Sequence, residues 1–297
     1  MPVLDRLPPL ARGALMVVAA CFLFTLVAVM IRIVTREVDP VEVAFFRNFF
    51  GLVFVLPWVL RLKGGLFRTG RLGLHALRAA IGVCATIAWF MALAVMPLAE
   101  ATALSFTSPL FATLGAGLLL GEKVDARRWL AVGIGFAGAM VVLQPGLGAL
   151  RLDSLLALAA AACMAGSALS VKTLSRSETP ATVVFYMGLI GSPLALLPAL
   201  PVWTAPSPTA WPYLAGIGLC AMLGQMLMVR GMAAADASAI MPFDFSRLIF
   251  AALAGAVLFG EMPDLWTWTG SGLIFLAALQ ALGRRPKVEE QAEALAS

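Results

Sequence analysis

Apolar residues run along the chain in ten stretches of roughly twenty residues, the length that crosses the hydrocarbon core of a bilayer as a helix. The runs are continuous, unlike the alternating ten-residue segments of a β-barrel, so helices are favoured. The pattern predicts an all-α polytopic membrane protein with ten transmembrane helices. They lie approximately at residues 13–34, 40–60, 74–95, 99–120, 128–144, 153–173, 180–200, 210–230, 238–260 and 265–283.

Several boundaries carry residues that begin or end helices. Asp39-Pro40 and Thr179-Pro180 place a capping residue before a proline at the first helical position. Gly121 follows the fourth run and Gly260 ends the ninth, and glycine commonly terminates a helix. The first run is longer than a signal-peptide core and lacks a clear cleavage site, so we expect it to stay in the protein as a helix.

Composition supports a membrane location. The 297 residues are 61% hydrophobic and 12% charged, whereas soluble domains carry about 25% charged residues. A soluble fold with this composition would expose large apolar patches. The four cysteines are far apart within apolar runs, so they indicate neither a disulfide framework nor a metal site.

The basic residues predict an orientation. If the N-terminus is cytoplasmic, 16 of the 21 lysines and arginines fall in cytoplasmic segments and three in external ones. This bias predicts that both termini are cytoplasmic. It also accounts for the net charge of +5 without a nucleic-acid partner, because the charges lie in separate short loops beside anionic lipids.

The two halves of the sequence resemble each other. Glu122 recurs as Glu261 and Phe106 as Phe245 at an offset of 139, and Pro40 recurs as Pro180 at an offset of 140. This predicts two five-helix repeats, 10–145 and 150–283, before a polar tail at 284–297. Five is odd, so the repeats are inverted, the usual architecture of secondary transporters with a midplane substrate site. A duplication retained for folding alone, a channel and an intramembrane enzyme are the alternatives.

Particular motifs make a family resemblance specific. Leu120-Gly121-Glu122 and Phe259-Gly260-Glu261 close the fourth helix of each repeat, and Pro97 to Leu104 is followed by Ser-Pro-Leu-Phe at 108–111. With ten spans, these resemble the drug/metabolite transporter superfamily, and within it the EamA-type transporters, most closely the YddG-type amino-acid exporters. The resemblance implies a central cavity lined by helices 1, 3, 4, 6, 8 and 9, with helices 5 and 10 peripheral.

Charged residues inside the predicted spans are the first candidates for chemistry, because a charge at mid-bilayer costs about 2.5–3.5 kcal/mol on insertion scales. Arg47 lies in the second span. Asp244 and Arg247 are three residues apart in the ninth and can pair on one helix face. Either they satisfy each other or they bind or gate near a substrate. Glu100 and His75 are further gating candidates, or simply a helix-start carboxylate and a passive interfacial histidine.

Uncharged polar and aromatic residues on the presumed cavity helices are candidates for substrate contacts, although hydroxyls also serve as interhelical contacts. Their distribution over several helices favours a lined cavity. Pro109 and Pro242 are candidate hinges, since proline removes a backbone hydrogen bond. The cavity candidates, besides Asp244, are Thr25, Thr86, Trp89, Ser105, Ser108, Ser167, Ser170, Gln225 and Phe243.

Nothing in the sequence indicates an enzyme, a cofactor or a metal site: Walker and metalloprotease motifs and paired catalytic carboxylates are absent. We therefore expect a monomeric or homodimeric secondary transporter in the inner membrane of a bacterium, whose partners are the bilayer and a small-molecule substrate. The resemblance implies export of amino acids or related metabolites by alternating access. Uptake of a nucleoside-like metabolite such as S-adenosylmethionine, and broad drug or metabolite efflux, are the alternatives.

Overall fold

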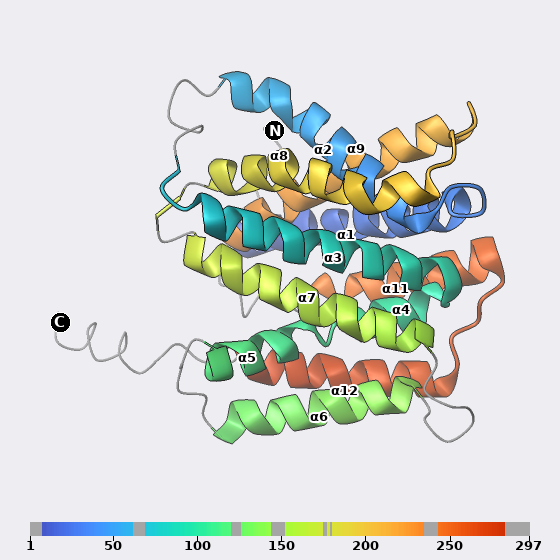
Figure 1. Ribbon diagram of the computed structural model, residues 1–297. Helices are drawn as coiled ribbons and strands as arrows, with labels where there is room; N and C mark the ends of the chain where they lie inside the picture. The colour runs from blue at the N-terminus through green and yellow to red at the C-terminus, as the bar shows by residue number, and fades with distance from the viewer. Residues whose placement is uncertain are drawn as a thin grey trace.

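The computed structural model describes residues 8–61, 69–119, 126–143, 152–174, 177–178, 180–234 and 243–282. Within these ranges the chain is helical and contains no strand, as the apolar runs predict (Figure 1). Six of the helices have the length and composition to cross a membrane, and shorter apolar helices accompany them. The helices are α1 (Pro9–Val34), α2 (Pro40–Arg61), α3 (Leu72–Val95), α4 (Leu98–Ser105), α5 (Ser108–Leu119), α6 (Ala126–Leu143), α7 (Leu152–Leu174), α8 (Pro180–Ala199), η2 (Leu200–Val202), α9 (Ala210–Ala234), α11 (Ser246–Ala254), η3 (Gly255–Phe259) and α12 (Leu265–Leu282).

Two predicted spans are interrupted. The span expected as one helix at 99–120 is divided into α4 and α5 by a turn at Phe106 and Thr107. Pro109 explains this, because its ring nitrogen cannot donate to the carbonyl one turn earlier, yet it is tolerated in the first turn of a new helix. In the described part of the span expected at 238–260, a turn at Phe245 precedes α11. Phe106 and Phe245 are repeat-equivalent, so both repeats break at the same place.

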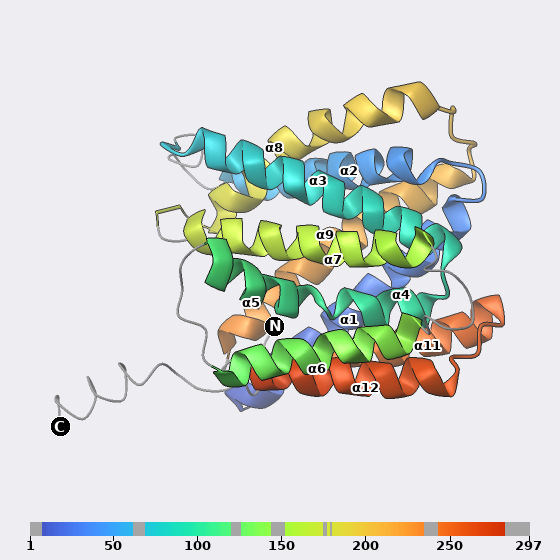
Figure 2. The ribbon, with the colours of Figure 1, turned by 60° about the horizontal axis from the view of Figure 1, so that its bottom comes forward.

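The packing follows a two-fold pattern. In the internal repeat, α1 corresponds to α7, α2 to α8, α3 to α9 and α6 to α12. The most extensive contacts are α1 with α9, its counterpart α3 with α7, and the self-equivalent pairs α6 with α12 and α2 with α8. Figures 1 and 2 show α6 beside α12 from both directions. This is the arrangement that two inverted five-helix repeats require.

Polar contacts at the helix ends show that α2 and α8 run in opposite directions. At one end, Glu42 accepts hydrogen bonds from Thr204, 3.1 Å from its amide nitrogen and 3.3 Å from its hydroxyl. At the other end, Thr69 donates to Glu178 at 2.6 Å. The sequence predicts that the Glu42 end faces outward, and we call it the outer end below. Asp39 caps α2 by accepting from the Val41 amide at 2.8 Å, as predicted.

Small residues allow the closest helix crossing. A Cβ placed on Gly138 of α6 would lie 2.8 Å from the carbonyl oxygen of Gly270 on α12, and one on Gly270 would lie 2.6 Å from the Gly138 carbonyl oxygen. These distances leave room for hydrogen only. Gly260, which ends η3, has a φ of 69° and so confirms the predicted glycine terminus.

Candidate functional site

The two broken helices meet at their breaks. The rings of Phe106 and Phe245 have centroids 5.1 Å apart, and Phe245 also lies 4.1 Å from the ring of Phe275 on α12. α4 has eight residues, so the first break lies about 12 Å along the helix from the outer end. Half the hydrocarbon thickness is about 15 Å. We therefore expect the aromatic cluster, Phe106, Phe245 and Phe275, to lie near the middle of the membrane.

Arg247 is the cation of this site. Its Nη2 donates to Ser105 Oγ at 3.3 Å, and its guanidinium carbon lies 4.7 Å from the centroid of the Phe106 ring. Its Nε is buried, and no acceptor among the described residues reaches it. A buried donor without a partner costs free energy, so this atom is suited to an acceptor on a bound molecule.

Asp244 is the anion of the site, and it faces α1. The Cys21 thiol donates to Asp244 Oδ1 at 3.3 Å and lies 3.5 Å from its main-chain oxygen. Thr25, one turn further along α1, donates to the Cys21 carbonyl at 3.0 Å. The sequence leaves open whether Asp244 pairs with Arg247; in the described structure Asp244 contacts Cys21 on α1 and Arg247 contacts Ser105 on α4.

Other predicted cavity residues lie elsewhere. Thr86 and Ser170 donate to carbonyls of their own helices, at 2.8 and 2.9 Å. Ser167 lies opposite Gly82 in the α3–α7 interface. Trp89 packs against the main apolar core. Three candidates have more open positions: Ser108, at the start of α5, is half-buried, whereas Gln225 and Phe243 are exposed.

The predicted gating residues are also dispersed. Arg47 is half-buried and contacts the neighbouring Asn48 Oδ1 at 3.4 Å. His75 is buried against Tyr186, with ring centroids 4.7 Å apart, and neither of its ring nitrogens has a hydrogen-bond partner in the described residues. Glu100 is half-buried at the outer end. The candidate hinge Pro242 lies outside the described residues, whereas Pro109 follows the observed break.

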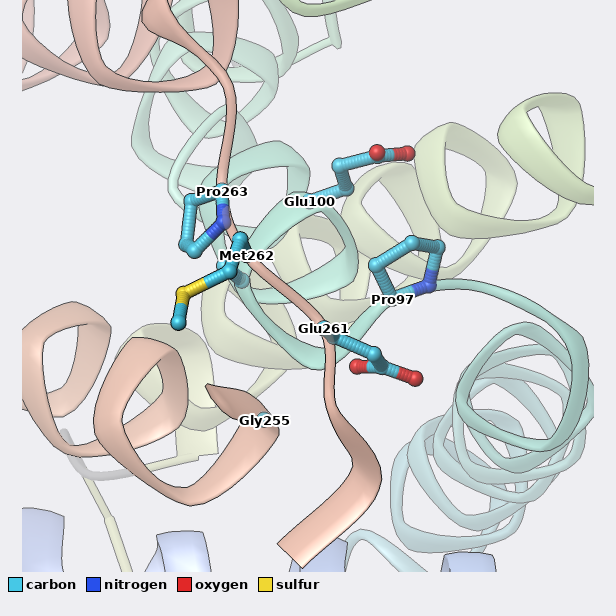
Figure 3. Close-up of a pocket in the computed structure, with 7 residues that line it drawn as sticks. Pro97, Glu100, Gly255, Glu261, Met262 and Pro263 are labelled. Atoms are coloured by element: carbon cyan, nitrogen blue, oxygen red, sulfur yellow. The ribbon is translucent and has the colours of Figure 1, made fainter. Parts of the chain in front are cut away.

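A contact at the outer end is not evident from the sequence. Arg32 of α1 forms an ion pair with Glu261, in the loop that follows η3. Nearby is a pocket of about 120 Å³ whose lining includes Glu100 and Glu261 (Figure 3). Sites for drug-sized ligands hold about 300–1,000 Å³, so this pocket is too small to enclose such a substrate. The internal repeat is the sequence feature that could have pointed to this contact. Lys172 and Glu122 occupy the positions that correspond to Arg32 and Glu261 in the other repeat.

Comparison with known proteins agrees with this architecture. The riboflavin transporter of Vibrio cholerae is 38% identical over 272 residues, covering 90% of this chain and 91% of that protein. The S-adenosylmethionine uptake transporter of Rickettsia prowazekii is 28% identical over 251 residues, covering 84% and 85%. A crystal structure with 20% identity superposes with a TM-score of 0.64 and covers 93% of this chain and 99% of that one, which supports the fold.

The family follows from a match over both halves. The model of the EamA-like transporter family matches residues 11–144 and again residues 152–282. The relatives are transporters of small metabolites, in agreement with a multi-pass, non-enzymatic protein of the bacterial inner membrane. Two family matches, one in each half of a ten-span chain, also agree with the internal repeat. The chain therefore belongs to the EamA-like transporter family.

Proposed function

We propose that this protein is a secondary transporter that carries riboflavin across the cytoplasmic membrane. The main support is the 38% identity to a riboflavin transporter over nine-tenths of both chains. In this proposal the two repeats, 10–145 and 150–283, rock against each other about the midplane site. The break between α4 and α5, with Pro109 beside it, is the hinge of the first repeat.

The chemistry of the midplane site fits a flavin. Riboflavin has a planar tricyclic ring with two carbonyl oxygens and a ribityl chain with hydroxyl groups. Stacking of a heterocycle on an aromatic side chain is worth about 1–3 kcal/mol, and Phe106 and Phe245 can provide such faces to a flavin that separates their rings. The unpartnered Nε of Arg247 can donate to a ring carbonyl, and Asp244 can accept from a ribityl hydroxyl.

Two other substrates have support of their own. Amino acids, which the family resemblance implies, carry a carboxylate and an ammonium that suit Arg247 and Asp244. S-Adenosylmethionine has a stackable base and a cationic sulfonium, and a relative 28% identical to this chain is an uptake transporter for it. Riboflavin is preferred because its transporter is the more similar of the two relatives and because three phenylalanine rings converge at the site.

A flux assay separates these candidates. We expect proteoliposomes containing the purified protein to exchange labelled riboflavin, with competition by unlabelled riboflavin. S-Adenosylmethionine and single amino acids should compete at least about tenfold more weakly, which corresponds to a difference of about 1.4 kcal/mol in binding free energy. Loading riboflavin on either side, with and without a proton gradient, gives the direction and the coupling. Riboflavin flux no faster than in empty liposomes refutes the proposal, and equal competition by an amino acid favours that substrate.

A further inference from the structure

Arg32 ties the two repeats together at the outer end. Besides its ion pair with Glu261, it donates to the main-chain oxygen of Met96, and its guanidinium carbon lies 5.4 Å from the centroid of the Phe259 ring. The two charged side chains are 19% and 17% exposed. Arg32 and Met96 belong to the first repeat, whereas Phe259 and Glu261 belong to the second. The contact therefore spans the boundary between the repeats in a largely dry setting.

Glu261 extends this contact to the first broken helix. Its Oε2 accepts from the amide of Leu98, the first residue of α4, at 2.9 Å. A carboxylate is favoured here because the first amides of a helix lack partners and carry partial positive charge. The Glu261 amide in turn donates to the Gly255 carbonyl at 2.9 Å, closing the turn after η3. One residue thus links α1, α4 and η3, and α4 leads directly to the midplane break.

Other contacts between the repeats differ from this one. Ser207 donates to Glu37 at 2.8 Å at the outer end, and Thr69 donates to Glu178 at 2.6 Å at the opposite end. These two bonds are counterparts of each other, since Glu37 and Glu178, like Thr69 and Ser207, are about one repeat apart in sequence. They are made at both ends at once, so neither distinguishes an open end from a closed one. The Arg32–Glu261 contact instead holds the outer tip of a helix that breaks at the substrate site.

We propose that the Arg32–Glu261 ion pair is a latch that keeps the outer end of the substrate pathway closed and must separate before that end opens. This inference rests on alternating access in the proposed function. In Figure 3, Glu261 lies beside Pro97 at the start of α4, and the Glu100 carboxylate points away from it. The pocket that these residues share with Ala99 marks where separation of α4 from the 261–263 loop begins.

The test measures access to Ala99, which is only 4% exposed and lines this pocket. The protein carries Ala99→Cys in a background whose four native cysteines are replaced by alanine, in nanodiscs that leave both faces accessible. A water-soluble maleimide reports opening, because only a thiol that reaches water ionises and reacts. We expect Arg32→Ala and Glu261→Gln each to speed labelling at least about tenfold, equivalent to about 1.4 kcal/mol. The double variant should add little, since both changes remove one contact.

Matched controls make the result specific. Arg36→Ala removes an exposed arginine at the same end, and Glu37→Gln weakens the bond from Ser207, so both should leave labelling unchanged. A cysteine at buried Ala165 on α7 should also react equally in all variants, which shows that the protein stays folded. Unchanged Ala99→Cys labelling, or faster labelling at both positions, overturns the latch. The assay needs no substrate, so its outcome is independent of whether riboflavin is transported.

Discussion

Replacing Arg247 with glutamine is expected to reduce riboflavin transport by about tenfold to hundredfold while the protein still inserts and folds. Hydrogen bonds from a charged donor are worth about 1.5–3 kcal/mol, and Arg247 is the described cation that contacts both Ser105 and Phe106. Insertion should not suffer, because removing a mid-bilayer charge relieves a cost of about 2.5–3.5 kcal/mol. The measurement is initial flux in proteoliposomes, normalised to the amount of monodisperse protein.

Arg247→Lys and Arg36→Gln are the controls for this prediction. Lysine retains the charge but loses the planar fork of the guanidinium, so it should give an intermediate flux. Arg36 is exposed at the end of α1, and its replacement should leave flux within about twofold. Normal transport by Arg247→Gln would show that the cation serves only the packing of α4 against α11, and the substrate site would have to be sought elsewhere.

Alanine at Gly138 or Gly270 is expected to destabilise the α6–α12 pair strongly. Each new Cβ would lie within 2.9 Å of backbone atoms on the facing helix, which cannot move as a flexible side chain does. Overpacking typically costs about 1–3 kcal/mol, and here two helix backbones have to separate. We expect a clear fall in the apparent melting temperature of the purified protein and a smaller monodisperse fraction. Thermal unfolding followed by size-exclusion chromatography measures both.

The same two helices provide the matched controls. At Gly133 on α6 and Gly272 on α12, no atom lies within 4 Å of the position that a Cβ would occupy, so alanine there meets open space. Alanine is also favoured over glycine in a helix by about 0.5–1 kcal/mol. Gly133→Ala and Gly272→Ala should therefore be neutral or stabilising. A similar loss of stability at all four positions would mean that glycine is needed for something other than this close crossing.

The apolar runs are sufficient to predict the helices, because a span must satisfy its backbone internally and this leaves few alternatives. They cannot predict the breaks at Phe106 and Phe245. An apolar run shows which residues can face lipid. A helix can break within it only where neighbouring helices satisfy the backbone groups that lose their partners at the break. Pro109 indicates a possible bend, but the structure shows a complete turn followed by a new helix.

Site residues are harder to predict for the same reason. Arg247 and Asp244 stand out as charges inside a span, and the structure brings both to the breaks. The sequence leaves open whether they pair with each other, whereas in the structure Asp244 contacts Cys21 and Arg247 contacts Ser105. Arg32 and Glu261 resemble ordinary loop charges in the sequence, since only the fold brings the ends of α1 and η3 together. The roles of these residues in transport stay predictions.

Binding of riboflavin to the purified protein tests the central claim, that the substrate stacks between the broken helices near the midplane. Bound riboflavin rotates more slowly than free riboflavin, so titration should give a saturable rise in the anisotropy of its fluorescence. We predict that Phe106→Ala combined with Phe245→Ala weakens this binding at least about tenfold, because each stacked ring contributes about 1–3 kcal/mol. Phe111→Ala, which removes a ring that packs on Phe136 instead, should bind normally. Undiminished saturable binding in the double variant, or no binding by the unmodified protein, would contradict the account.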